Sequence, residues 1–321
     1  MVQVQLDSVN GTGHGTLSKR PILVTGAPRS GTTWVGRMLA YAPGVGYIHE
    51  PFNPTTAAGV SGRPFTRFFE YVTPETEDRS VGHLERTLRF SYDLRRQLPT
   101  VRSVRAVART SIDFYTFTRL RVAHARPLVK DPIAVFSAGW LADRFEMDVV
   151  VTIRHPAAFV ASFKRLGWRH RFSSFVEQPC LLADYLGPFE REIRQFADHP
   201  GDQIDESILL WRLIHHTASR YRQERRDWTF VRHEDLSLDP ARRFEELYAA
   251  LELELTSTAR TAIAEHSSAR NPHQAGGAHS IRLDSRSNIH GWRRVLTSEE
   301  IERVREGVGD VAIQFYAADE W

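Results

Sequence analysis

The chain has 321 residues and carries 42 Lys and Arg against 39 Asp and Glu, which gives a formal net charge of +3 at pH 7. This small positive charge does not indicate nucleic-acid binding, although it suits a small anionic ligand. The single cysteine excludes an internal disulfide, and no apolar run approaches the ~20 residues that cross a membrane. A hydrophobic content of 41% is sufficient for the core of one large domain.

Residues 1–20 are rich in glycine and polar residues and lack the apolar stretch of a signal peptide, so we expect a mobile tail. Residues 21–321 are expected to form a single domain. The lone cysteine and the lack of a membrane-spanning run lead us to expect a cytoplasmic protein with no integral membrane segment.

After this tail, segments with strand character alternate with segments with helix character. Strands are expected at 21–25, 45–48, 126–130, 148–153 and 228–232. Helices are expected at 32–41, 80–98, 104–123, 134–144, 156–165, 181–198, 204–224, 240–251 and 298–307. This alternation predicts an α/β fold in which a parallel sheet has helices on both faces. The segments of about 53–125 and 166–226 are expected to be insertions that carry a specificity pocket.

Residues 21–34 read Pro-Ile-Leu-Val-Thr-Gly-Ala-Pro-Arg-Ser-Gly-Thr-Thr-Trp and combine a buried strand, a loop of small residues and the start of a helix. Such a loop presents backbone N–H groups and the positive end of the helix dipole to an anion. Gly26 and Gly31 have the spacing of a Walker A loop, but Thr32 stands where its lysine should follow. Arg29 supplies a cation within the loop instead. The candidate anion-binding residues are Arg29, Ser30, Gly31, Thr32, Thr33 and Trp34; an ordinary strand–turn–helix is the alternative.

A second motif spans residues 149–165 and begins with a β-branched run that is typical of a strand buried on both faces. Pro156 suits the first turn of the helix that follows. Arg154 leaves the end of the strand, and Ser162 lies about two helical turns further along. Both side chains can therefore donate to one phosphate, unless the polar residues of this helix merely face water.

The segment from Pro28 to Trp34 closely resembles the 5′-phosphosulfate loop of the sulfotransferases that use 3′-phosphoadenosine 5′-phosphosulfate (PAPS). Arg154 and Ser162 resemble the 3′-phosphate motif of the same family. The resemblance implies a P-loop-like fold and in-line transfer of a sulfuryl group from PAPS to a hydroxyl of a carbohydrate, lipid or secondary-metabolite acceptor. It also places the acceptor side in the two insertions.

A base is needed to take the proton of the acceptor hydroxyl. Glu50 follows the second strand, where carbohydrate and tyrosylprotein sulfotransferases place a similar Glu as the general base. His49 is the rival, because its ordinary pKa is more convenient. A purely structural role for Glu50 in the turn around Pro51 stays open.

The third strand ends in Lys130-Asp131-Pro132, whereas cytosolic sulfotransferases carry Lys-Thr-His near this point. The resemblance implies that Lys130 and Arg29 stabilise negative charge during transfer, although Lys130 can instead pair with a neighbouring carboxylate. Because Asp131 and Pro132 replace the other two residues, the chain looks closer to the carbohydrate and tyrosylprotein type.

Two weaker segments extend the resemblance. His233 occupies the place of a nucleotide-binding Tyr, and Trp292, Arg293 and Arg294 lie in a basic segment that resembles the one closing on the 3′-phosphate. A solvated charge run is the alternative for that segment.

The sequence contains no typical metal-binding spacing, so no metal is expected. Two other functions stay open: a P-loop small-molecule kinase that uses Mg-ATP, and a non-catalytic nucleotide-binding module. A homo-oligomer is compatible with the sequence.

Overall fold

The computed structural model describes residues 19–272 and 284–321, so the tail expected at the N-terminus lies outside the described residues except for its last two. Arg20 is one of these two, and its Nε donates a hydrogen bond to the carbonyl oxygen of Glu146 at 3.0 Å.

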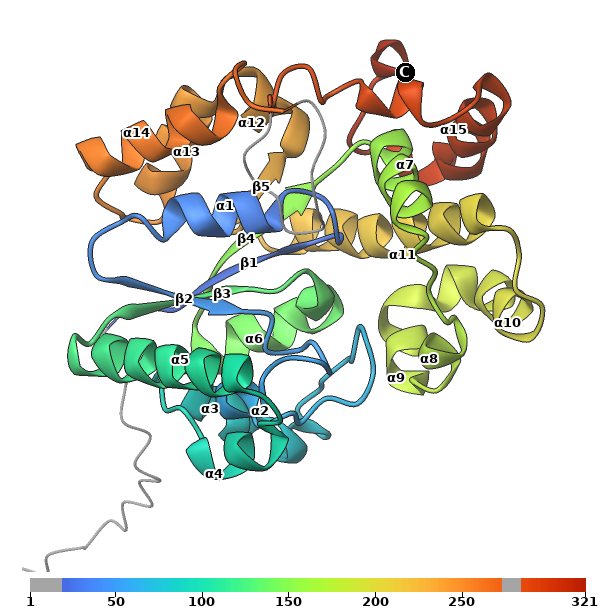
Figure 1. The fold of residues 1–321 in the computed structure, drawn as a ribbon. Helices are drawn as coiled ribbons and strands as arrows, with labels where there is room; N and C mark the ends of the chain where they lie inside the picture. Colours follow the sequence, from blue (N-terminus) through green and yellow to red (C-terminus); the bar gives the residue numbers. More distant parts are fainter. Residues whose placement is uncertain (1–18, 273–283) are drawn as a thin grey trace, which may run out of the picture.

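Five parallel strands form one sheet in the order β2-β3-β1-β4-β5 (Figure 1). They are β1 (Ile22–Gly26), β2 (Val45–His49), β3 (Arg126–Lys130), β4 (Asp148–Ile153) and β5 (Thr229–Arg232). The predicted α/β fold and all five predicted strands are therefore confirmed. Because every strand runs in the same direction, the loops that follow β1, β2, β3 and β4 all leave the same edge, where ligands bind in such sheets.

Helices cover both faces of this sheet, and the odd and even residues of β1 explain why. Ile22 and Val24 pack against Val35 and Met38 of α1 on one face. Leu23 belongs to the other core, together with residues of α6 and α11. In Figure 1, α1, α13 and α14 accordingly lie above the sheet, and α5 and α6 lie below it. The α-helices are α1 (Thr32–Leu39), α2 (Ala58–Ser61), α3 (Val81–Leu88), α4 (Leu94–Gln97), α5 (Val104–Val122), α6 (Ala138–Phe145), α7 (Pro156–Leu166), α8 (Ser173–Val176), α9 (Pro179–Leu181), α10 (Glu190–Asp198), α11 (Gln203–Glu224), α12 (His233–Leu238), α13 (Pro240–Ala250), α14 (Ser257–Ser267) and α15 (Ser298–Ala312).

Two predicted helices are wrong in their extent. The helix expected at 80–98 is divided into α3 and α4, because Phe90 adopts a left-handed conformation (φ 51°) and Asp93 caps α4 as a new start. The helix expected at 181–198 is divided into α9, a π turn, a 3-10 turn and α10. Pro188 lies in the 3-10 turn, where its missing N–H interrupts a regular helix. Helices α2, α8, α12 and α14 were not predicted.

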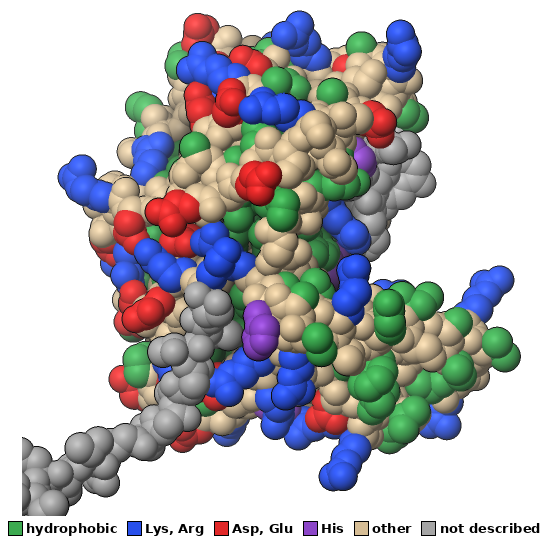
Figure 2. Space-filling model, turned by 90° about the vertical axis from the view of Figure 1, so that its left-hand side faces the viewer, with side chains coloured by type: hydrophobic (Ala, Val, Ile, Leu, Met, Phe, Trp, Pro, Cys, Tyr) green, Lys and Arg blue, Asp and Glu red, His purple; other side chains and the backbone are tan. Residues whose placement is uncertain are grey.

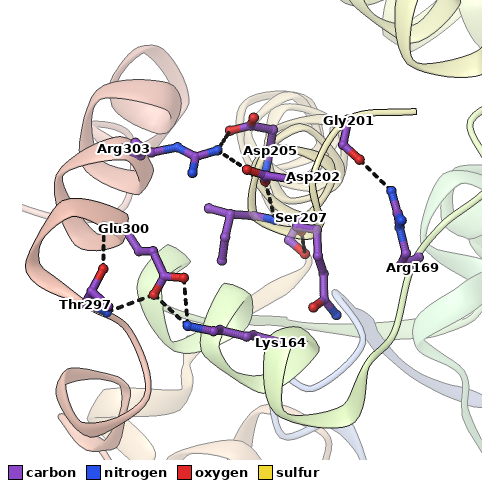
Figure 3. A network of polar contacts seen from close by, with 11 residues as sticks. Lys164, Arg169, Gly201, Asp202, Asp205, Ser207, Thr297, Glu300 and Arg303 are labelled. Atoms are coloured by element: carbon purple, nitrogen blue, oxygen red, sulfur yellow. Dashed lines mark hydrogen bonds and ion pairs between the residues drawn. The ribbon is translucent and has the colours of Figure 1, made fainter. Parts of the chain in front are cut away.

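Helix α15 is fixed to the body of the protein by an ion-pair network (Figure 3). Lys164 of α7 donates to both carboxylate oxygens of Glu300 at 2.7 Å. Glu300 also completes a capping box with Thr297 at the start of α15. One turn later, Arg303 donates to Asp202 and Asp205 at 2.6 Å each, at the start of α11. The network holds the segment immediately before α15, the 3-10 helix Gly291–Arg294, against α7.

An aromatic cluster buries His155, the first residue after Arg154. Its ring stacks on Trp292 with a centroid distance of 5.3 Å and contacts Tyr316 and Trp321 edge to face. Neither ring nitrogen has a hydrogen-bond partner. Burial lowers the pKa of His155 to about 3, so the imidazole is neutral in the folded protein.

Gly26 is expected to be irreplaceable where β1 meets the loop. Its φ is +133°, and a Cβ built there lies 2.2 Å from the carbonyl oxygen of Thr152 on the neighbouring strand. Gly26→Ala should therefore lower the free energy of unfolding by about 2 kcal/mol or more, measured by denaturant titration. Gly44→Ala is the matched control, because Gly44 also has a positive φ of +72° but no neighbouring atom within 4 Å; it should cost about 1 kcal/mol. Equal losses at the two sites would contradict this steric explanation.

His155→Phe should stabilise the protein more at acid pH than at neutral pH. The unfolded chain takes up a proton on His155 as the pH falls through about 6.5, whereas the folded chain does not until about pH 3. The folded state therefore loses stability as the pH falls through this window. We expect the gain from His155→Phe in urea unfolding to be about 2 kcal/mol larger at pH 5 than at pH 7.5. The same change at the exposed His199 is the control; an equal gain from His155→Phe at both pH values would show that His155 is not the titrating group.

Candidate active site

The loop after β1 leaves the first turn of α1 without a side-chain cap. Gly31 is the N-cap of α1 with φ 89°, and a Cβ there would lie 2.7 Å from the ring of His233. Since glycine has no side chain to cap the helix, the first N–H groups of α1, at Thr32, Thr33 and Trp34, are available to a ligand. The Ser30 hydroxyl donates a hydrogen bond to the carbonyl oxygen of Ala27.

The structure brings the two sequence motifs together. Arg29 adopts a left-handed conformation (φ 69°), and its Nε donates to Ser162 Oγ at 3.0 Å. Arg154 donates from its guanidinium to the carbonyl oxygen of Arg29. The Nε of Arg154 is buried and has no hydrogen-bond partner. Arg29, Arg154 and Ser162 therefore form one donor-rich cluster beside α1.

The electrostatics of this cluster favour an anion. Burial and the nearby Arg154 and Arg165 guanidinium groups lower the pKa of Arg29 to about 10. Burial also lowers the pKa of Arg154. Burial and the charges of Arg154 and Arg29 lower the pKa of His233, which keeps its ring neutral. Because both arginines stay protonated at neutral pH while they repel each other, an anion bound between them lowers the energy of the cluster.

A cavity of about 30 Å³, which we call the arginine cavity, opens beside this cluster. Besides Arg154 and Ser162, its walls include Arg165, Asn288 and Arg294. Arg293 points elsewhere, because it donates to the carbonyl oxygen of Trp321 at 2.9 Å. Of the two predicted C-terminal arginines, Arg294 is thus the one that the structure places beside Arg154.

Trp34 and Trp292, which the sequence singled out, are both buried against other aromatic rings. Trp34 is buried, with its ring edge to face against His233 at 5.9 Å and against Phe244 at 5.3 Å. Its indole N–H has no partner. Trp292 is buried against His155 and also lines the arginine cavity.

Glu50 and Lys130 form an ion pair at the carboxyl ends of β2 and β3. The pairing of His49 with Lys130 across these strands places Glu50 next to Lys130, and the N–H of Glu50 donates to the Lys130 carbonyl at 2.9 Å. Lys130 Nζ donates to Glu50 Oε1, and Asn53 donates to Glu50 Oε2 at 2.8 Å. The pairing that the sequence left open for Lys130 is therefore present. Lys130 is fully buried.

Glu50 is ionised in this setting. Burial raises the pKa of Glu50, but the charge of Lys130 and its hydrogen bond outweigh that effect and bring the pKa below its usual value. The carboxylate can therefore accept a proton at neutral pH. The adjacent Asp131 is fully buried, and burial together with the charge of Glu50 raises the pKa of Asp131 to about 7. Its carboxylate accepts from the N–H groups of Phe52 and Ile133, which is a structural task.

His49, the other candidate base, lies beside Glu50 and is more exposed. Its Nε2 is 3.9 Å from Glu50 Oε1, and its Nδ1 is 3.3 Å from the Tyr47 hydroxyl. The His49 side chain is 40% exposed, against 13% for Glu50. Glu50 is therefore the better enclosed of the two candidate bases.

Two larger cavities meet at Glu50, and Thr33 and Asn53 also line both. The first, of about 510 Å³, is the aromatic cavity, because Phe68, Phe69, Phe163 and Trp168 line it together with Arg29. The second, of about 1000 Å³, is the α5 groove, whose walls include Arg37, His49, Arg109 and Arg119. Both predicted insertions contribute to the aromatic cavity, and the first contributes to the α5 groove.

The sequence did not single out Arg165 or Trp168. Arg165 lies three residues after Ser162 on α7, and this spacing on one helix face was a usable signal. Trp168 places its ring 5.9 Å from the Arg29 guanidinium; since it lies in a loop, no periodicity points to it. Within residues 19–272 and 284–321, no cluster of three or more His, Cys, Asp or Glu could hold a metal ion, and no helix could span a membrane.

Several solved structures are similar to the chain. The sulfotransferase domain from the curacin biosynthetic pathway is 13% identical with a TM-score of 0.46, over 90% of this chain and 97% of that one. Sulfotransferase STF1 from Mycobacterium tuberculosis H37Rv is 18% identical with a TM-score of 0.43, over 91% and 77%. Mouse sulfotransferase SULT7A1, solved in complex with PAP, is 11% identical with a TM-score of 0.42, over 94% and 85%.

No curated protein sequence matches the chain. The model of the sulfotransferase family does match, and it matches residues 21–257. This range contains the loop after β1, the Glu50–Lys130 pair and the Arg154–Ser162 cluster. The chain therefore belongs to the sulfotransferase family.

Proposed function

We propose that this protein transfers a sulfuryl group from PAPS to a hydroxyl acceptor. The observation that carries the proposal is the buried Arg154 side chain, whose Nε has no partner and whose neighbours are Ser162, Arg165 and Arg294. These donors offer a second phosphate site beside the N-terminus of α1. A donor with a 5′-phosphosulfate and a 3′-phosphate carries two separate anionic groups and can fill both sites. ATP carries a single triphosphate chain and no 3′-phosphate, so it fills only one.

The residues present fit such a nucleotide in three ways. The N–H groups of Thr32, Thr33 and Trp34 face an anion at the start of α1. Arg154, Ser162 and Arg294 provide charged and neutral donors for a second anion. His233 lies beside Gly31 at the start of α1 and packs on Trp34, and its neutral ring is suited to contact an uncharged adenine base.

PAPS, when bound, supplies the sulfuryl group that passes to the acceptor oxygen, and adenosine 3′,5′-bisphosphate is the other product. We assign Glu50 as the base, because its carboxylate is ionised and lies at the junction of the aromatic cavity and the α5 groove. Lys130 and Arg29 provide positive charge for the negative charge that develops in the transition state. In the structure Lys130 holds Glu50 in place, so it orients the base as well.

The placement of the base after β2 supports a carbohydrate or tyrosylprotein type of site over the cytosolic type. Pro132 stands where the cytosolic type has its histidine. The neighbouring Asp131 carboxylate accepts hydrogen bonds from two backbone N–H groups. The aromatic cavity offers flat apolar faces for a ring or chain, and the α5 groove offers arginines. A carbohydrate, lipid or secondary-metabolite hydroxyl can reach Glu50 from either.

Adenosine 3′,5′-bisphosphate should bind much more tightly than ADP or ATP in isothermal titration calorimetry. Arg154→Ala should cost roughly 1.5–3 kcal/mol of that binding, because it removes a charged hydrogen-bond donor. Arg294→Ala should also weaken it, and Arg293→Ala is the matched control since its guanidinium contacts Trp321 instead. Equal affinity for the three nucleotides would contradict the proposal. A preference for Mg-ATP would contradict it as well and would favour a P-loop kinase.

Glu50→Gln should lower turnover by about 10²–10⁴ and leave the binding of adenosine 3′,5′-bisphosphate nearly unchanged, because it keeps the shape of the side chain and removes the base. Turnover is measured by product formation from PAPS with a panel of hydroxyl acceptors. His49→Asn is the neighbouring control and should do much less damage. If His49→Asn is inactive and Glu50→Gln is active, the base is His49.

A further inference from the structure

Helix α5 exposes an unusual amount of apolar surface. Six of the twelve large hydrophobic side chains that are exposed in residues 19–272 and 284–321 lie on this one helix of 19 residues. Val104 is 86% exposed, Tyr115 69% and Val122 74%. Exposed apolar residues scattered singly are ordinary, but a group of this kind on one element marks an interaction surface.

Four of these six side chains form a stripe with Ala108, whereas Val107 and Phe114 lie about a quarter turn to one side. Val104, Ala108, Ile112, Tyr115 and Val122 recur at helical spacing and so lie along one side of α5, which we call the α5 stripe. Thr110 and Phe117 are the buried residues of the helix and face the opposite way. The helix therefore has a side that packs on the protein and a second apolar side that no described residue covers.

The stripe is bordered by positive charge. Helix α5 contains Arg105, Arg109, Arg119 and Arg121 against a single acid, Asp113, which lies 3.9 Å from Arg109. Figure 2 views the side of the molecule on which α5 lies, and hydrophobic side chains gather in its lower right part with basic side chains around them. Apolar side chains flanked by arginines are the pattern of a helix that lies in the plane of an anionic membrane surface.

We propose that the α5 stripe docks this protein on an anionic lipid surface. Charge complementarity favours a lipid surface over a second copy of this chain as the partner. Two copies packed through the α5 stripe would bring their arginines together, whereas anionic lipid headgroups attract these arginines. The helix lies on the surface and does not cross it, since no helix among the described residues is apolar enough to span a membrane.

The same helix forms a wall of the α5 groove, through Arg109, Thr116, Arg119 and Leu120 among others. Docking therefore holds that groove beside the lipid surface. One consequence rests on the proposed function: an acceptor hydroxyl on a membrane-anchored molecule then has the shortest path to Glu50. The docking itself depends only on the outer side of α5 and is measurable without donor or acceptor.

The test is flotation of the full chain with two kinds of vesicle, phosphatidylcholine alone and phosphatidylcholine with phosphatidylglycerol. The wild type should bind the anionic vesicles at least about tenfold more tightly at low salt, and the preference should shrink as salt is added. The double variant Ile112→Glu/Tyr115→Glu should lower binding to the anionic vesicles by about tenfold or more, since it places two carboxylates in the stripe. Arg105→Glu/Arg121→Glu tests the charged border and should reduce the same preference.

Leu238→Glu/Ile313→Glu is the matched control, because it places two carboxylates at exposed apolar positions outside α5; it should bind like the wild type. Circular dichroism and thermal unfolding of all variants establish that they are folded. Binding lost only in the α5 variants supports the proposal. It is overturned if the wild type ignores anionic vesicles, if the control loses binding equally, or if sedimentation shows a dimer that the α5 variants dissociate, because the stripe is then an interface between copies.

Discussion

The hydrogen bond from the Arg154 guanidinium to the carbonyl oxygen of Arg29 joins two segments that are 125 residues apart. It ties the end of β4 to the loop after β1, while Arg29 adopts its left-handed conformation and reaches across to Ser162. It therefore brings the loop that precedes α1 next to the strand end from which Arg154 and the arginine cavity begin. The nucleotide proposed above, which has two anionic groups, depends on this proximity of the two segments.

The charged side chains of the site all lie at this same edge of the sheet, on the two sides of β1. On one side of β1, Arg29 and Arg154 stay positive although burial lowers the pKa of each. On the other side, Lys130 neutralises the negative charge of the Glu50 carboxylate within an ion pair. A buried pair of this kind gives little stability, so its value lies in orientation: Glu50 stays ionised and fixed between the aromatic cavity and the α5 groove. The excess of positive charge is left for a ligand to neutralise.

The periphery of the molecule supports this centre in two ways. Glu300 and Arg303 anchor α15 to α7 and α11, and they hold the 3-10 helix that carries Arg294 beside Arg154. Helix α5 packs one side on the protein and leaves the apolar α5 stripe outside. Apolar residues therefore lie on two sides of α5, and for this reason it does not have the simple pattern of one apolar and one polar side.

The sequence by itself determined the five strands, the parallel sheet and the two anion motifs, because β-branched runs, glycine-bounded turns and helix starts are local signals. It also placed Glu50 and Lys130 at strand ends. Only the tertiary structure decided that these two side chains pair, that Arg29 contacts Ser162, and that Arg294 lines the arginine cavity while Arg293 does not. The division of the helices expected at 80–98 and 181–198 has local causes, the cap at Asp93 and the proline at position 188. The contacts between these side chains depend instead on strand order or on packing between distant segments, and neither leaves a periodic trace along the chain.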